Sequence, residues 1–266
     1  MSRGETEPAQ PRPSGTDVPG SAPDTTGSRG TRILGVVGIV GIIASAAWAF
    51  AWSPQDDPPS EGGLGQSIRI MYVHVGTVSI AYLFLVGCAL FSIWVLWKRS
   101  QFADVAAHAC AEIGVVLLGL TLITGSLWGK ITWGAFWVWD ARLTTTALLF
   151  LMYVGYLSVR AATPEPRTRA TRAAIVGIAS AVLIPIVHKS VEWWSSLHQE
   201  STLFGTLNPK LGGAQLFTLM LSMATMLVIC GWLFMHRFRV GWLSQQAEEH
   251  GLADAIAERR AEGVTV

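Results

Sequence analysis

Six long apolar segments joined by polar connections constrain this sequence more than any other feature. Most of them approach the roughly 20 residues that a helix needs to cross the hydrocarbon core of a bilayer. The fifth is shorter and contains Pro185, which a bent helix packed among other helices tolerates. We therefore expect an all-α membrane protein, built as a six-transmembrane-helix bundle. The segments are residues 33–52, 70–97, 111–128, 143–159, 173–187 and 216–235.

The composition agrees with a membrane protein and argues against nucleic-acid binding. Hydrophobic residues make up 51% of the chain and charged residues 14%, whereas a soluble domain carries about 25% charged residues. The net charge of +1 provides no basic surface for nucleic acid. Cys88, Cys110 and Cys230 lie in apolar segments and form no Cys-x-x-Cys pair, so we interpret them as small core residues.

Positive charges lie mainly in alternate connections, and they predict the orientation of the bundle. By the positive-inside rule both termini are cytoplasmic, and the loops 53–69, 129–142 and 188–215 face outward into the periplasm. The cations on the predicted cytoplasmic side are Arg29, Arg32, Lys98, Arg99, Arg160, Arg167, Arg169, Arg172, Arg237 and Arg239.

The two ends of the chain are predicted to lie outside the membrane domain. Residues 1–31 are rich in Pro, Gly, Ser and Thr and are expected to form a disordered cytoplasmic tail. Residues 32–240 form the membrane domain, and 241–266 are a cytoplasmic C-terminal tail. The sequence Ala44-Ser45-Ala46 fits a signal-peptidase site, so removal of the first segment is an open alternative.

The second outward loop and its borders are dense in aromatic residues. One interpretation is interfacial anchoring by an aromatic belt. The other is a flat aromatic surface for a planar apolar ligand whose carboxylates pair with Lys130 or Arg142. The aromatic residues are Trp128, Trp133, Phe136, Trp137 and Trp139, followed by Asp140.

Two histidines are expected at similar depth near this loop. His74 lies a few residues inside the second segment, and His188 lies at the outer end of the fifth, three residues after Pro185. Pro185 should bend that helix and direct His188. Ionisable residues inside membrane segments are functional candidates. Two neutral imidazoles suit haem iron or a transition metal, and the aromatic surface favours the larger, planar ligand.

The third outward loop contains further aromatic residues. We predict a short interfacial helix that carries Trp194 and His198 as an i, i+4 pair on one face. For His198, contact with a ligand and a place on a polar surface helix both stay open. His108, His236 and His250 are interpreted as surface or structural residues on the cytoplasmic side.

The chain has no nucleotide-binding motif of its own. Gly125 to Lys130 superficially resembles a phosphate-binding loop, but the glycine spacing is one residue short and Ile131 stands where Ser or Thr is needed. We therefore expect no ATPase site.

Three motifs resemble the haem-handling membrane proteins with a tryptophan-rich "WWD" loop, and among them the CcmC family (haem exporter protein C). The motifs are MYVHVG at 71–76, GSLWGKITWGAFWVWDARLTT at 125–145 and IPIVHKSVEWWSSLHQ at 184–199. The similarity runs over residues 70–239. The sequence departs from the family pattern at Phe136, where tryptophan is typical, and at Ile131 and Gly76, where proline is typical.

The resemblance implies a bacterial inner-membrane protein that binds haem b transiently and handles it during c-type cytochrome biogenesis. It implies His74 and His188 as axial haem ligands, and it places the aromatic residues and Asp140 in the haem-contacting loop. It also implies a periplasmic haem chaperone (CcmE) as the recipient, and an ATPase (CcmA), a membrane subunit (CcmB) and a small single-span subunit (CcmD) as partners, besides membrane lipid. Such a protein is not an enzyme.

Two other functions stay open. A cytochrome c synthase (haem lyase) subunit also carries a tryptophan-rich loop, but its loop resembles Trp-Asp-Pro, whereas Ala141 and Arg142 follow Asp140 here. A permease that binds no haem should show polar residues midway through several segments, and these segments show few.

Overall fold

The structure, a computed structural model, describes residues 28–53, 65–198 and 212–261. This part of the chain is helical and contains no β-strand. Six of its helical stretches are long and apolar enough to cross a membrane, which confirms the predicted fold class. In chain order the elements are α1 (Arg29–Ala51), the 3-10 turn η2 (Gly65–Ser67), α2 (Ile68–Lys98), α3 (Gln101–Trp133), α4 (Ala141–Ala162), α5 (Pro166–Ala181), α6 (Leu183–Trp193) and α7 (Gly213–Ala261).

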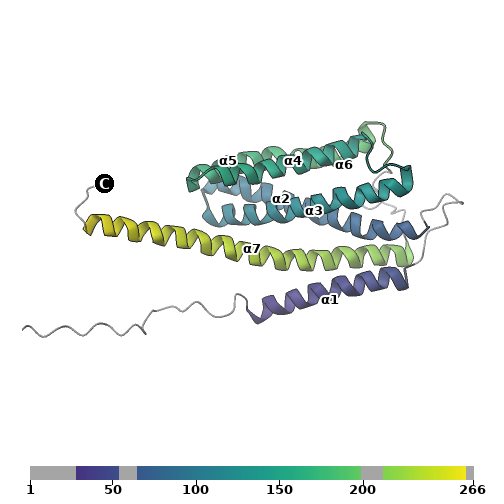
Figure 1. Cartoon of the computed structure of the whole chain (residues 1–266), viewed down its shortest axis with the longest axis horizontal. Coiled ribbons are helices and arrows are strands. Elements are labelled where there is room, and N and C mark those ends of the chain that lie inside the picture. The colour runs from purple at the N-terminus through teal and green to yellow at the C-terminus, as the bar shows by residue number, and fades with distance from the viewer. Residues whose placement is uncertain (1–27, 54–64, 199–211, 262–266) are drawn as a thin grey trace, which may run out of the picture.

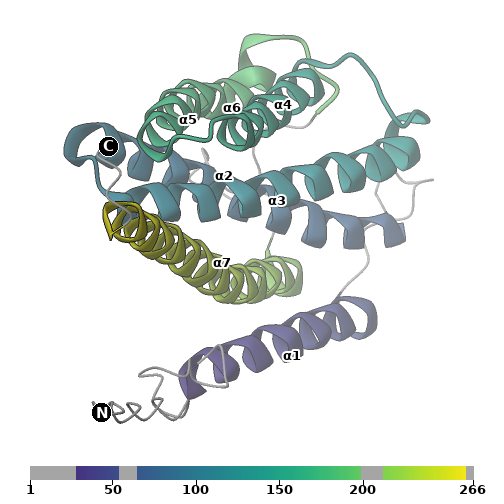
Figure 2. The ribbon, with the colours of Figure 1, turned by 60° about the vertical axis from the view of Figure 1, so that its left-hand side comes forward.

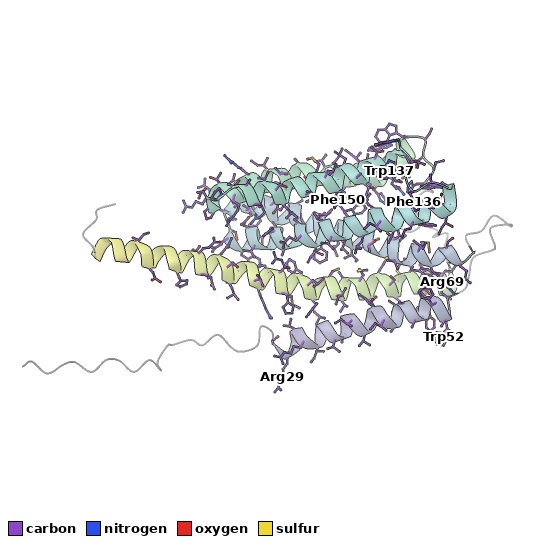
Figure 3. All side chains as sticks on the ribbon, in the orientation of Figure 1. Arg29, Trp52, Arg69, Phe136, Trp137 and Phe150 are labelled. Carbon is purple, nitrogen blue, oxygen red and sulfur yellow. The ribbon has the colours of Figure 1, made fainter. Side chains whose placement is uncertain are left out.

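The helices are arranged around the α2–α3 pair. These two helices pack along their length, with α4, α5 and α6 on one side and α7 on the other (Figures 1 and 2). The outermost helix, α1, packs almost entirely against α7. We call the end that carries the α3–α4 loop, residues 134–140, the aromatic end; Phe136 and Trp137 mark it in Figure 3. The opposite end, where α3 begins and α4 ends, is the ion-pair end.

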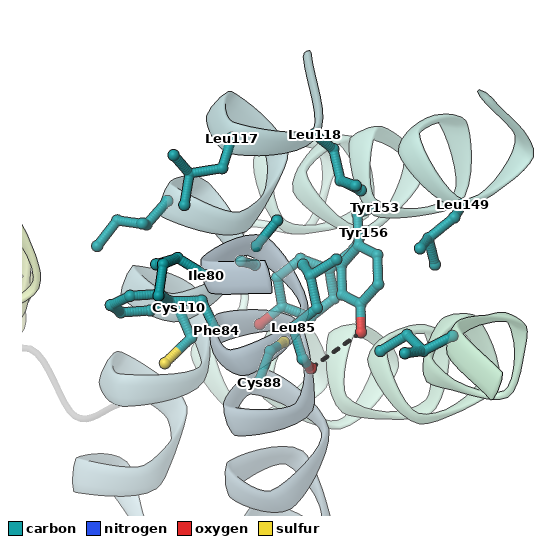
Figure 4. Packing of buried hydrophobic residues seen from close by; sticks show 14 of the residues in the cluster. Ile80, Phe84, Leu85, Cys88, Cys110, Leu117, Leu118, Leu149, Tyr153 and Tyr156 are labelled. Atoms are coloured by element: carbon teal, nitrogen blue, oxygen red, sulfur yellow. Dashed lines mark hydrogen bonds between the residues drawn. The ribbon is translucent and has the colours of Figure 1, made fainter. Parts of the chain in front are cut away.

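The core lies where α2, α3, α4 and α5 meet. Leu85, Cys88, Tyr153 and Tyr156 are fully buried there, and the Tyr153 hydroxyl donates to the Leu85 carbonyl at 3.1 Å (Figure 4). A Cβ atom at Gly114 would lie 2.2 Å from Leu85 Cδ2, so α2 and α3 approach closely only because this position is glycine. The prediction that the cysteines are core residues is confirmed, since all three are buried and free.

The fifth membrane span consists of two helices. Val182 interrupts it between α5 and α6. Pro185 has no backbone N–H and therefore cannot donate to the Ala181 carbonyl four residues earlier, which is where α5 ends. The interruption lies close to Pro185, and Val182 itself keeps helical backbone angles, φ −60° and ψ −27°. The neighbours of the span change there, because α5 packs against α2 and α4 whereas α6 packs mainly against α4.

The ion-pair end is closed by contacts among the chain's own charged groups. Arg160 forms a bidentate pair with Asp104, with N–O distances of 2.5 and 2.9 Å, and both side chains are buried. Gln245 on α7 donates to the same carboxylate at 3.5 Å. A second pair joins Arg237 on α7 to Glu112 on α3. The extension of α7 beyond the bundle is thereby attached to α3, which Arg160 joins to α4.

Three predicted boundaries were wrong. The third span runs from Gln101 to Trp133, so Trp128 and Lys130 lie on the last turns of a helix and not in a loop. The sixth continues as helix to Ala261, through much of the predicted C-terminal tail. The tail predicted at 1–31 overlaps α1, which Ser28 caps by accepting the Thr31 N–H at 3.3 Å. Residues 1–27 lie outside the described residues.

The short helix predicted around Trp194 and His198 was also wrong. Helix α6 ends at Trp193, and Trp194 has extended backbone angles, φ −129° and ψ 154°. The following residues up to His198 are not helical. Their polar groups form hydrogen bonds with Asp140 on the neighbouring loop instead of with their own helix.

Candidate functional site

His74 is held by three residues of α3 at the aromatic end. Its Nδ1 atom lies 3.1 Å from Thr124 Oγ1, and its ring packs edge-to-face on Trp128 with centroids 5.7 Å apart. A Cβ atom at Gly125 would lie 3.0 Å from His74 Cε1, which is closer than side chains normally pack. Glycine at position 125 therefore lets the imidazole lie directly against the backbone of α3.

Trp128 carries a hydrogen-bond donor that is not used. Its indole Nε1 is buried and, within the described residues, has no hydrogen-bond partner. Buried polar groups in native proteins are nearly always paired, and an unpaired donor costs about 1–3 kcal/mol. Because this indole packs on His74, an unpaired hydrogen-bond donor belongs to the immediate surroundings of the imidazole.

His188 lies on α6 at a depth similar to that of His74. It is five residues before the last residue of α6, Trp193, and His74 is six residues after the first residue of α2, Ile68, which corresponds to roughly 8–9 Å from each helix end. Its backbone is fixed because Arg142 Nη2 donates to the His188 carbonyl at 3.1 Å.

The two imidazoles are available as ligands. In the described part of the chain, the His188 ring forms no hydrogen bond, and none joins it to His74. Helix α6 is also not packed extensively on α2. The structure therefore brings both histidines to the aromatic end of the bundle.

Asp140 joins the two connections of the aromatic end. Its carboxylate caps α4 by accepting the Arg142 N–H at 3.0 Å. It also accepts the Ser196 hydroxyl at 3.0 Å, the Leu197 N–H at 2.8 Å and His198 Nδ1 at 3.0 Å. Burial alone would raise the pKa of Asp140, but these hydrogen bonds hold it below its ordinary value. We call this arrangement the Asp140 clamp.

The clamp fixes the orientation of His198. Because a carboxylate accepts only, His198 Nδ1 carries the proton and Nε2 is left as the basic nitrogen. The ring also packs edge-to-face on Trp133, with centroids 4.7 Å apart. Burial lowers the pKa of His198 even though Asp140 opposes the shift, so the imidazole is neutral at neutral pH.

The remaining predicted aromatic residues form an exposed rim. Trp139 is 86% exposed and Phe136 56% exposed, and Trp137 packs edge-to-face on Trp139. Trp194, 52% exposed, packs on Trp193 across the rim. Large apolar groups left open at one end of a bundle are typical of a binding surface or a membrane interface.

The two predicted cations have different surroundings. Lys130 Nζ donates to the Gly134 carbonyl at 2.8 Å and lies 5.5 Å from the centre of the Phe136 ring, at the exposed rim. Gly134 ends α3 with φ +77°, a conformation that favours glycine. Arg142 is partly buried and donates to α6, so it orders the base of the site.

The donor set suits a large planar ligand better than a small metal ion. In the described ranges there is no group of three or more His, Cys, Asp or Glu side chains arranged to hold a metal ion. What this end offers is two imidazoles, an unpaired indole N–H and several aromatic faces. Haem matches that set, because its iron takes axial imidazoles, its macrocycle packs on aromatic rings and its propionates accept hydrogen bonds.

Sequence reasoning missed two residues of this site, Thr124 and Gly125, which contact His74. It included Asp140 but not the contact of Asp140 with the segment around His198. A signal for Thr124 was present, because it lies four residues before Trp128 and a continuous helix places both on one face. The predicted segment 111–128 contains both residues, but periodicity alone does not pair Thr124 with His74 on another helix.

The comparisons with known proteins agree with these features. A family model described as "CcmC: Heme exporter protein C" matches residues 23–253. Three curated relatives are each named "Heme exporter protein C". The one from Haemophilus influenzae is 36% identical over 76% of this chain and 80% of its own length. That from Bradyrhizobium diazoefficiens is 37% identical over 59% and 58%, and that from Escherichia coli is 40% identical over 58% and 61%. This multi-pass membrane chain belongs to the heme exporter protein C family.

Proposed function

We propose that this chain binds haem b transiently at the outer face of the bacterial inner membrane and delivers it to a periplasmic haem chaperone during c-type cytochrome biogenesis. The observation that carries the proposal is the pairing of His74 with Trp128, whose buried indole N–H has no partner among the described residues. The names of the related proteins support haem as the cargo.

In this proposal His74 and His188 bind the haem iron from opposite sides. The lack of extensive packing between α6 and α2 supports it, because two directly packed helices would leave no room for a macrocycle between the histidines. Bound haem would supply an iron with both axial positions filled, which disfavours reaction with oxygen.

The aromatic rim and the cations complete the proposed site. Trp128, Trp133, Trp137 and Trp139 with Phe136 pack on the macrocycle, and Trp194 and His198 lie at its edge. Lys130, which is exposed and bonded only to a carbonyl and an aromatic face, pairs with a propionate, as does Arg142 nearer the base. The exposure of Trp139 leaves the rim open to a recipient protein.

The proposed partners follow from the family. The recipient is the haem chaperone CcmE. The ATPase CcmA, the membrane subunit CcmB and the small subunit CcmD work alongside, because the chain has no ATPase motif of its own. Lipid covers the apolar faces of the outer helices.

Haem transfer to the chaperone tests this function. The haem-loaded full chain in lipid nanodiscs is mixed with the periplasmic domain of the chaperone or with an apocytochrome c, and haem is followed in each protein. We expect haem to move to the chaperone and not to the apocytochrome. Transfer to apocytochrome alone would favour the synthase function, and retention of all haem by the chain would contradict delivery.

A further inference from the structure

His74 has two ring nitrogens, and only a nitrogen without a proton binds iron. The hydrogen bond made by one ring nitrogen decides whether that nitrogen carries the proton, and therefore whether the other nitrogen is left without one. Within the part of the chain that the structure describes, the one hydrogen bond of the His74 ring to a side chain is to Thr124 Oγ1, at 3.1 Å from Nδ1. The direction of this one hydrogen bond therefore decides which nitrogen of His74 is available.

The surroundings of Thr124 settle that direction. Its Oγ1 lies 2.8 Å from the Leu120 carbonyl oxygen and 3.3 Å from the Thr121 carbonyl oxygen. A hydroxyl has one proton, and carbonyl oxygens only accept. If that proton pointed at His74, a lone pair of Oγ1 would face the Leu120 oxygen at 2.8 Å, which is repulsive. The Thr124 proton therefore goes to Leu120, and Oγ1 accepts a proton from His74 Nδ1.

The backbone beside the imidazole is held by two further threonines. Thr77 donates to the His74 carbonyl at 2.9 Å, and Thr121 Oγ1 lies 3.2 Å from Thr77 Oγ1. This threonine network joins α2 to α3 at the level of the imidazole.

We propose that Thr124 is a positioning residue that holds His74 as the Nδ1–H tautomer and so presents Nε2 as the ligand atom. The consequence for haem rests on the proposed function, whereas the tautomer is a property of the chain alone. A hydrogen bond from Nδ1–H also increases the basicity of Nε2, which favours the oxidised iron. Thr124 thus determines both which nitrogen of His74 binds the iron and how much electron density that nitrogen donates to it.

The tautomer is measured directly by nitrogen NMR of the haem-free full chain with ¹⁵N-labelled histidine, in mildly alkaline buffer where the imidazole is neutral. Comparison with His74→Ala assigns the signals. We expect wild type and Thr124→Ser to show a protonated Nδ1 and a bare Nε2, and Thr124→Val to gain signal from the Nε2–H tautomer. An unchanged tautomer in Thr124→Val would overturn the proposal.

Thr132→Val is the matched control. The Thr132 hydroxyl also donates to the carbonyl four residues earlier on α3, that of Trp128 at 3.0 Å, but it is exposed and makes no contact with a histidine. We expect it to leave the His74 signals unchanged. A change equal to that of Thr124→Val would assign the effect to the helix as a whole and overturn the proposal.

Measurements of haem binding distinguish a failure of this proposal from a failure of the proposed function. With haem bound, Thr124→Val should raise the reduction potential and weaken binding roughly 10-fold, and Thr124→Ser should restore both. If wild type shows the Nδ1–H tautomer but binds no haem, the proposed function fails and the role of Thr124 in the tautomer stands. If haem binds with the same affinity and potential in Thr124→Val, Thr124 does not position the ligand.

Discussion

The two ends of this bundle use their polar side chains in opposite ways. At the ion-pair end, Asp104 and Arg160 are buried and bonded to each other in bidentate geometry. At the aromatic end, the His188 ring forms no hydrogen bond with the described residues, and the buried indole N–H of Trp128 has no partner among them. The charged groups of one end are paired with each other, although Arg160 Nε, Arg169 Nε and Gln245 Oε1 are buried there without a hydrogen-bond partner among the described residues. The other end leaves neutral imidazole and indole nitrogens unpaired.

The difference between the two ends separates the residues that stabilise the fold from those proposed to bind a ligand. Buried charges without partners destabilise a protein strongly, so the ion pairs at one end hold α3, α4 and α7 together. Neutral imidazoles and indoles cost less when unpaired, so a membrane bundle tolerates them at a site that binds a cargo and releases it. The Asp140 clamp is the exception at the aromatic end, because there a charged group is fully paired and orders two connections.

The largest effect should come from breaking the ion-pair end. Arg160→Ala leaves Asp104 buried without its partner, and we expect the free energy of unfolding to fall by about 3–5 kcal/mol. Denaturant unfolding in detergent micelles measures it, with Arg172→Ala, an exposed cation at the same end, as the control. Haem affinity of the folded fraction should not change. A loss below about 1 kcal/mol would show that this pair does not hold the bundle together.

The next effect tests the Asp140 clamp. Asn caps helices as well as Asp does, so Asp140→Asn keeps the cap of α4 but offers one acceptor atom in place of two. We expect local destabilisation of about 1–3 kcal/mol, seen as faster amide exchange around Leu197. Exchange in the first turn of α4 serves as the internal control. Equal protection of Leu197 in both proteins would mean that Asp140 does not clamp the segment.

A smaller effect is expected from a change that weakens haem binding without lowering the stability of the fold. Gly125→Ala adds a methyl group 3.0 Å from His74 Cε1 and should displace the imidazole. Alanine in a helix interior is ordinarily more stable than glycine by about 0.5–1 kcal/mol. We therefore expect haem binding to weaken about 10-fold, as for other changes beside a metal ligand, without a comparable loss of stability. Gly155→Ala, where a Cβ meets nothing within 4 Å, is the control.

The smallest effect is the pH dependence of the clamp. Folding lowers the pKa of His198. As the pH falls below about 6.5, this histidine therefore binds a proton more readily in the unfolded chain than in the folded one. Local stability declines below that pH. Folding also lowers the pKa of Asp140, so the contribution of its carboxylate to local stability is complete above pH about 3.9 and is lost as the pH falls further. Amide exchange of Leu197, corrected for intrinsic rates, should show both steps. In Asp140→Asn the lower step should be absent, and its persistence there would assign it to another group.

The sequence predicted the fold class and the residue types of the site better than it predicted the contacts between the site residues. Apolar segment length was sufficient to predict six spans, and Pro185 indicated the interruption of the fifth. Helix ends were less predictable, because polar residues such as Lys130 and Thr132 continue α3 past its apolar part.

The contacts of the site depend on tertiary structure that periodicity does not encode. The pairing of Asp140 with His198 spans 58 positions in the chain, and that of His74 with Thr124 spans 50. The predicted helix at His198 failed for the same reason, since a carboxylate from another loop took up its hydrogen-bond donors. The residue types indicated a binding site, but only the packing of α2 on α3 identified its supporting residues.

The central claim is that His74 and His188 bind haem at the aromatic end. Absorption spectra of the purified chain, oxidised and reduced, test it most directly when wild type is compared with the double variant His74→Ala, His188→Ala and with His108→Ala at the ion-pair end. We predict a six-coordinate low-spin haem spectrum in wild type and in His108→Ala, and its loss in the double variant. The same spectrum in the double variant, or no haem in wild type after haem is added, would contradict the assignment.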